Sequence, residues 1–153
     1  MAFATFRAAD AVAIRVQPSQ WVQAGIDMRE LDPAQARDLE EQSIAWTARA
    51  ADGRILCCAG FIETLEGVRA NAWAMLAAGL GVRQHLAITR YARSRIAESA
   101  LPRIECLTND DGRCIKWAVA VGLQFRARLE CWGANAEDVL LFDRIRRSAP
   151  CRP

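Results

Sequence analysis

Residues 76–100, LAAGLGVRQHLAITRYARSRIAESA, decide which fold the chain can adopt. Two glycines, Gly79 and Gly81, separate the end of an apolar run from a long segment with apolar residues every three or four positions. That spacing is typical of a helix with one buried face. The residues expected on that face are Leu86, Ile88, Tyr91 or Ala92, and Ile96. The stretch therefore predicts a strand that ends near residue 77, a short glycine loop, and a helix over 82–100.

Upstream of this stretch, the pattern predicts three antiparallel strands. They span residues 44–50, 54–65 and 68–77. The pairs Asp52-Gly53 and Glu66-Gly67 stand between them, and such pairs are typical of tight hairpin turns.

The flanking segments complete the prediction. Before the hairpins we expect a strand over 3–7, an extended piece over 11–16, a helix over 18–28 and a helix over 33–43. The last of these helices begins at Asp32-Pro33, an N-cap carboxylate followed by proline. After the long helix we expect a strand over 103–108, a helix over 111–121 ended by Gly122, and strands over 123–133 and 138–146. This order predicts an α+β fold with a mixed, mainly antiparallel sheet flanked by helices, and with one crossover through the long helix.

Composition sets the class of protein. The chain has 153 residues, 52% hydrophobic and 25% charged, with a net charge of +2. We expect a single domain over 1–147 and a flexible tail over 148–153. No apolar run is long enough for a membrane span, and Arg7 and Asp10 interrupt the segment where a signal peptide would be apolar. The small net charge makes nucleic acid an unexpected partner, although the arginines at 90, 93, 95, 144, 146 and 147 leave that possibility open.

The cysteines and the histidine predict no metal site. The six cysteines form no CxxC pair, and His85 is the only histidine. Cys57, Cys58 and Cys106 stand in apolar runs, where a free cysteine behaves as a small buried hydrophobe. Cys114 and Cys131 have arginines nearby in sequence but no patterned acid or histidine, so we expect structural cysteines in a reducing compartment.

The element order and two stretches resemble the GNAT acyltransferase superfamily over nearly the whole chain. The stretches are residues 43–61, SIAWTARAADGRILCCAGF, and residues 114–125, CIKWAVAVGLQF. Within the superfamily, the chain looks most similar to acyltransferase-like proteins of tailed phages, including an internal virion or assembly protein. The resemblance implies a GNAT-like sheet and, in an active member, acetyl-coenzyme A as the cofactor.

The resemblance also implies a cofactor cradle. The family binds the pyrophosphate of coenzyme A at the N-terminus of the central helix, where free N–H groups and the helix dipole favour an anion. The residues expected to form this cradle are Met75, Ala77, Gly79, Gly81, Val82 and Arg83. Leu76 stands where the family has a polar residue.

The catalytic residues are less complete. The family often has a Tyr four residues before the glycine that follows the last helix, as an acid for the departing thiolate. This chain has Ala118 there, and its only Tyr, Tyr91, is expected to be a packing residue. As a base that deprotonates an amine we expect Glu105 or Glu63, with Glu66 and His85 as other candidates.

Two functions follow from this pattern. In the first, the chain keeps the GNAT fold with degenerate catalytic motifs and serves as a phage structural or assembly component. Its partners would then be other virion or assembly proteins or a second copy of itself, in the host cytoplasm or the phage particle. Trp132 is the aromatic residue expected at such a contact surface. In the alternative, the chain is an active acetyl-CoA-dependent N-acyltransferase.

Overall fold

The computed structural model describes residues 1–20, 22–23, 26–27, 31–133 and 135–146. Its main sheet has seven strands in the order β1-β4-β5-β6-β7-β9-β8. The strands are β1 (Ala2–Thr5), β4 (Ser43–Arg49), β5 (Ile55–Leu65), β6 (Arg69–Leu76), β7 (Arg103–Asn109), β8 (Gln124–Leu129) and β9 (Val139–Ile145). β6 and β7 are parallel, and the other neighbouring strands in this sheet are antiparallel. The predicted α+β class and the mixed, mainly antiparallel sheet are confirmed.

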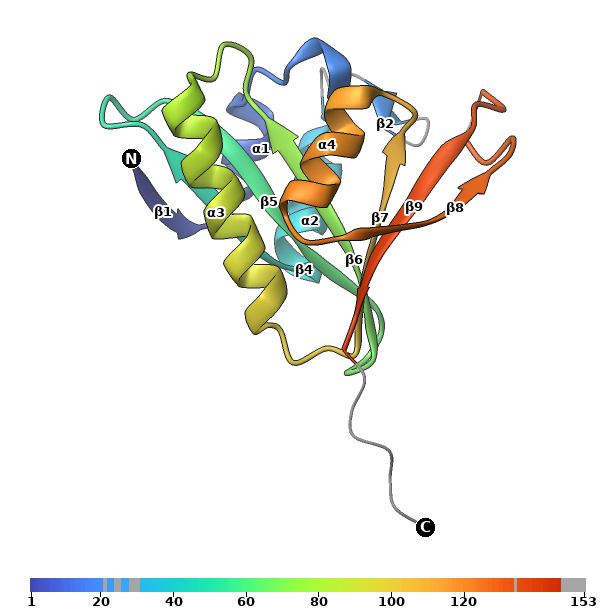
Figure 1. Cartoon of the computed structure of the whole chain (residues 1–153). Helices are drawn as coiled ribbons and strands as arrows, with labels where there is room; N and C mark the ends of the chain where they lie inside the picture. Colours follow the sequence, from blue (N-terminus) through green and yellow to red (C-terminus); the bar gives the residue numbers. More distant parts are fainter. Residues whose placement is uncertain (21, 24–25, 28–30, 134, 147–153) are drawn as a thin grey trace.

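Helices cover both faces of the sheet (Figure 1). They are α1 (Ala8–Ala13), α2 (Pro33–Gln42), α3 (Val82–Glu98) and α4 (Gly112–Ala120). Helices α3 and α4 pack on one face around a core that includes Ile88, Ile104 and Phe142. Helices α1 and α2 pack on the other face around Phe6, Ala36 and Met75. The structure is therefore a three-layer sandwich with the sheet in the middle.

The sheet is splayed between β6 and β7. The two strands pair only at Arg69–Arg103, Ala70–Ile104 and Asn71–Glu105. Beyond those three pairs, β6 continues to Leu76 and β7 continues to Asn109, but the two strands no longer pair with each other. Figure 1 shows them meeting at the bottom of the view and diverging toward the top. A gap inside a sheet leaves a strand edge without its neighbour, which is where a ligand can enter.

Two N-terminal predictions are wrong. In the segment predicted to be extended over 11–16, the first three residues belong to helix α1, whereas Ile14 is extended and Val16 forms an isolated bridge with Ala77. The run AADAVA is rich in alanine, the strongest helix former, and Glu40 Oε2 accepts a hydrogen bond from Ala8 N–H at 2.7 Å at the helix start.

The helix predicted over 18–28 is also wrong. The structure has a 3-10 turn at Pro18–Gln20, followed by β2 (Val22–Gln23) and β3 (Ile26–Asp27), which pair with each other. Residues 21, 24, 25 and 28 lie outside the described residues. Tertiary contacts override helix propensity here, because Gln17 and Gln20 bond to the edge of β6.

Smaller differences concern the helix face and the tail. Ile88, Ala92 and Ile96 are buried as predicted, but Leu86 is 48% exposed because it borders the cleft described below. The strand predicted over 123–133 ends at Leu129, and Cys131 adopts a left-handed φ of 51°. The predicted tail over 148–153 lies outside the described residues.

Gly60 provides a test of the sheet packing. A Cβ at this position would lie 2.5 Å from Ala45 Cβ and 2.8 Å from the Ile44 carbonyl oxygen. We expect Gly60→Ala to lower the free energy of unfolding by at least about 2 kcal/mol, because the clash involves backbone in the centre of the sheet. Urea denaturation measures this loss. Gly112→Ala is the control, since a Cβ there meets nothing within 4 Å, and equal stability of the two variants would contradict the packing.

Candidate functional site

The splay of the sheet opens into a cleft of about 950 Å³. One side of the cleft is β6, with Ala72 and Trp73, and the opposite side is β7, with Leu107 and Thr108. Residues from α2 line it on one face of the sheet, and residues from α3 and α4 line it on the other. The cleft therefore spans both helix layers, so two ligands entering from opposite faces could meet between β6 and β7.

The loop between β6 and α3 joins two residues that line this cleft, Leu76 at the end of β6 and His85 in the first turn of α3. Gly79 has a φ of +73°, a conformation that glycine adopts without strain. Gly81 is the N-cap of α3 with an ordinary φ of −72°, so its backbone does not require glycine. A Cβ at Gly81 would have Gln84 Oε1, at 3.7 Å, as its one neighbour within 4 Å. The missing side chain leaves space beside the first N–H groups of the helix.

The N-terminus of α3 differs from those of the other described helices. A carboxylate accepts a backbone hydrogen bond at the start of each of the others: Glu40 at α1, Asp32 at α2 and Asp111 at α4. Helix α3 has no acidic residue in its first turn and no side chain that caps it from the N-cap position. Gln84 Oε1 accepts from Gly81 N–H at 3.1 Å. The positive end of the α3 dipole is therefore not neutralised by a protein carboxylate, which favours an external anion there.

The residues predicted to hold a cofactor fall into two groups. Gly79, Gly81, Val82 and Arg83 lie at this helix N-terminus, and Val82 is 78% exposed. The side chains of Met75 and Ala77 are buried in the core beneath α1 and α2, so only their backbone lies along the strand that leads to the loop.

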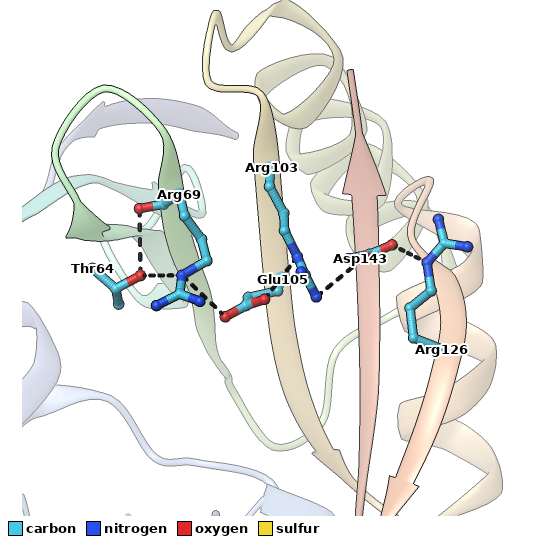
Figure 2. A network of polar contacts seen from close by, with 6 residues as sticks. All are labelled: Thr64, Arg69, Arg103, Glu105, Arg126 and Asp143. Atoms are coloured by element: carbon cyan, nitrogen blue, oxygen red, sulfur yellow. Dashed lines mark hydrogen bonds and ion pairs between the residues drawn. The ribbon is translucent and has the colours of Figure 1, made fainter. Parts of the chain in front are cut away.

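Glu105, the first predicted base, is held in a network of ion pairs at the closed end of the splay (Figure 2). Its carboxylate lies 2.9 Å from Arg103 Nε and 3.7 Å from Arg69 Nε. Arg103 also reaches Asp143, at 3.3 Å, and Asp143 pairs with Arg126. Figure 2 shows the network crossing β6, β7, β9 and β8. Because its carboxylate pairs with the guanidinium groups of Arg69 and Arg103, the main structural role of Glu105 is to join β6 and β7.

The other candidates for a base lie in different places. Glu63 Oε2 accepts a hydrogen bond from Gly67 N–H at 2.7 Å and thereby closes the β5–β6 turn. Its side chain borders a second, smaller cavity and not the cleft. Glu66 is an exposed residue of the same turn. His85, by contrast, lines the cleft from the first turn of α3.

Helix α4 shows what replaces the expected tyrosine. Ala118 is 4% exposed and lines the cleft, and Cys114 lines it one turn earlier. Burial raises the pKa of the Cys114 thiol, so this group is neutral at neutral pH. Trp117 Nε1 donates a hydrogen bond to Thr89 Oγ1 at 3.0 Å and joins α4 to α3. Tyr91 stacks on Phe3 at a centroid distance of 3.8 Å, which confirms the prediction that it is a packing residue.

The charged residues of the cleft are divided between its two faces. Arg113 and Lys116 of α4, with His85 of α3, line the side on which α3 begins. Asp38 of α2 lines the opposite side and is the single acidic residue among the described residues of the cleft. The cleft is thus basic toward α3 and α4 and acidic toward α2.

Sequence reasoning missed Asp38 and Gln20. Asp38 looks in sequence like any exposed helix acid, and only the fold turns it toward the cleft. Gln20 is 8% exposed and bonds to the edge of β6, although nothing in the run PSQ marks it. Of the predicted basic residues, Arg144 bonds to the carbonyl oxygens of Ile96 and Leu101, so it stabilises the end of α3.

No family model matches the sequence, and no curated protein matches it either. Solved structures do match over nearly the whole chain. A putative acetyltransferase, yncA, from Salmonella typhimurium with acetyl-CoA aligns with a TM-score of 0.73 and 13% identity, over 97% of this chain and 96% of that one. A phosphinothricin acetyltransferase of the GNAT superfamily from Sinorhizobium meliloti, in complex with acetyl-CoA, aligns with a TM-score of 0.72 and 13% identity, over 94% and 87%.

A ribosomal-protein-alanine N-acetyltransferase from Brucella melitensis gives a TM-score of 0.71 and 15% identity, over 95% of this chain and 99% of that one. These likenesses define a GNAT acetyltransferase fold. The predicted GNAT-like architecture is confirmed, and the agreement at such low identity shows that backbone geometry carries the likeness.

Two negative findings complete the description. Among the described helices, none has the length and hydropathy of a membrane span. Within the same part of the chain, no three His, Cys, Asp or Glu side chains gather as metal ligands would.

The reactivity of the cysteine thiols tests which of them are buried. Burial raises the pKa of Cys58 and of Cys106 to about 12, and it raises that of Cys57 well above its ordinary value. We expect iodoacetamide at pH 8 to label exposed Cys131 at least about tenfold faster than these three, because the thiolate is the reactive form. Site-resolved mass spectrometry measures the rates. Equal labelling of Cys58 and Cys131 in folded protein would contradict the structure.

Proposed function

We propose that the protein is an acyl-CoA-dependent N-acyltransferase with acetyl-CoA as the donor. The observation that carries this proposal is the N-terminus of α3, which no carboxylate caps and whose first turn lines, through His85, the cleft between β6 and β7. The structural neighbours named above include two that hold acetyl-CoA. These neighbours support an active N-acyltransferase, which was the alternative drawn from the sequence. Nothing in the comparisons associates this chain with a phage particle.

The residues at the basic mouth fit the donor. Acetyl-CoA brings several phosphate charges and an acyl thioester on a long arm. The first N–H groups of α3 favour a phosphate, and Gly81 leaves the approach to them open. Arg113 and Lys116 line the cleft from α4, and Arg83 lies in the first turn of α3, so all three add positive charge near the start of that helix. The arm would then reach into the splay between the strands.

The acidic mouth fits the acceptor. Asp38 is an exposed residue of α2 that lines the cleft, and the lining also includes Leu31, Leu39 and Ile62. A carboxylate in a cleft that also has apolar lining favours an ammonium group carried on an apolar body. We infer that a primary amine enters from the α2 side and meets the acyl group at the splay.

The chemistry requires little from side chains. The ammonium group of the acceptor first gives one proton to water or to a base in the cleft. Transfer then joins the amine nitrogen to the acyl carbon, breaks the carbon–sulfur bond, and leaves a second proton of the nitrogen on sulfur. Two groups in the cleft, His85 and the neutral Cys114 thiol, can exchange a proton within the cleft or through water. The cleft contributes mainly by holding both reactants in place, an effect that reaches effective molarities on the order of 10⁵ M or more.

Donor binding is the first test. Isothermal calorimetry of the purified protein with acetyl-CoA should give saturable heat at tens of micromolar. We expect Gly81→Leu to weaken binding at least about tenfold, because its side chain occupies the space beside the α3 N–H groups. Val119→Ala is the control, since Val119 is an exposed residue of α4 that does not line the cleft. Folded wild-type protein that gives no heat would reject the proposal and favour the structural role.

Acceptor binding is the second test. We expect Asp38→Asn to raise the KM for an amine acceptor about fivefold to tenfold, because a charged hydrogen bond becomes a neutral one. The Kd for acetyl-CoA should stay the same. Glu41→Gln is the control, because Glu41 is an exposed acid of α2 outside the cleft. A KM that responds equally to both substitutions would remove Asp38 from the acceptor site.

A further inference from the structure

The splay leaves an edge of β6 that needs hydrogen-bond partners. The N–H and C=O groups of Ala74 and Leu76 point away from β5, toward the gap, because the groups of Ala77 pair with β5 through Leu56. Met75 and Leu76 are buried, and buried backbone polar groups are almost always paired. In a continuous sheet β7 would pair with them, but its pairing with β6 ends at Asn71.

The N-terminal segment covers part of this edge with its backbone. Gln17 N–H donates to the Leu76 carbonyl oxygen at 2.9 Å, and Ala78 N–H donates to the Arg15 carbonyl oxygen at 2.7 Å. Val16 and Ala77 form an antiparallel bridge. These contacts fix the outer end of the edge, next to the loop that leads to α3.

The side chain of Gln20 covers the next part. Gln20 Oε1 accepts from Leu76 N–H at 2.8 Å, and Gln20 Nε2 donates to the Ala74 carbonyl oxygen at 3.1 Å. A residue of a parallel strand pairs in the same way, by accepting from one residue and donating to the residue two positions earlier. The carboxamide of Gln20 therefore takes the place of one peptide group of a missing parallel strand, and it also lines the cleft.

Any ligand with an amide in its chain competes for the same two groups. The pantetheine arm of an acyl-CoA carries two secondary amides, each with one N–H and one C=O. An amide pairs with a free strand edge as a peptide does. The arm has to run from the mouth at α3 into the splay, and the edge occupied by Gln20 lies along that path.

We propose that Gln20 is an internal competitor for the amide-bearing arm of an acyl donor, and that the donor displaces its carboxamide from Leu76 and Ala74. This rests on the proposed function. Displacement exchanges two hydrogen bonds for two others, so Gln20 lowers the affinity for the donor while it keeps the edge of β6 paired in the absence of ligand.

The experiment compares two ligands on two variants by calorimetry. Acetyl-CoA has both the phosphates and the amide arm, whereas adenosine 3′,5′-bisphosphate has phosphates without the arm. We expect Gln20→Ala to bind acetyl-CoA about fivefold to tenfold more tightly than wild type, because the competitor is gone, and to bind the bisphosphate with unchanged affinity. Gln42→Ala is the matched control, a glutamine of the same cleft outside the hydrogen bonds of the β6 edge. It should change neither affinity.

Gln20→Met keeps the volume of the side chain and serves where the alanine variant is unstable. Hydrogen exchange gives a reading that needs no ligand. In wild type the Leu76 amide should be protected from exchange. In either Gln20 variant its exchange rate should rise at least about tenfold, whereas the exchange rate of the Cys57 amide, in the paired interior of the sheet, should stay the same.

The outcomes separate the two proposals. Tighter binding of acetyl-CoA alone supports displacement of Gln20. Unchanged or weaker binding of acetyl-CoA by both Gln20 variants overturns it, even though wild-type protein binds the donor. Absence of binding of either ligand to wild-type protein instead overturns the proposed function. Rapid exchange of Leu76 in the wild type would show that the carboxamide does not hold the edge.

Discussion

The whole structure depends on where β6 and β7 stop pairing. Their parallel ladder has three pairs and ends at Asn71–Glu105. At that end the ion pairs of Glu105 and Asp143 with three arginines join four neighbouring strands, so the closed end of the splay is fixed. Asp143 is 1% exposed, and a buried carboxylate is tolerated there only because Arg103 and Arg126 face it. Because the gap starts at a fixed point, its width along the cleft can also be fixed. A cleft that positions two reactants requires such a fixed width.

An open gap in a sheet has a cost that the rest of the chain offsets. Each unpaired buried N–H or C=O would cost about 1–3 kcal/mol. The N-terminal segment removes part of that cost at Leu76 and Ala74, and the helix layers remove apolar surface on both faces. The N-terminal segment thus lines the cleft through Gln17 and Gln20, although the sequence predicted a helix over 18–28. This explains why the helix predicted over 18–28 does not form: the contacts with β6 are worth more than the local propensity.

The sequence predicted the fold where local signals agree. The Asp-Gly turn at Gly53, the capped start at Asp32 and the spacing of Ile88, Ala92 and Ile96 each point to one structure, and each is confirmed. Candidate site residues were harder to place, because side-chain identity does not reveal a partner. Glu105 has the expected strand and face, but its arginine partners come from β6 and β7, which only the fold brings together. Whether Glu105 takes part in catalysis stays a prediction.

The features that support the proposed acyl transfer belong mostly to the backbone. The α3 amides and the edge of β6 involve no particular side chain, so they tolerate most substitutions that keep the splay, whereas the bare Cα of Gly81 requires glycine. This accounts for a fold shared with acetyltransferases at 13% to 15% identity. It also limits what the missing tyrosine means. If positioning in the cleft supplies most of the rate, Ala118 removes one proton donor and leaves the larger effect intact. The side chains that would distinguish this protein are then Asp38, which we propose binds the acceptor, and Gln20, which we propose competes with the donor.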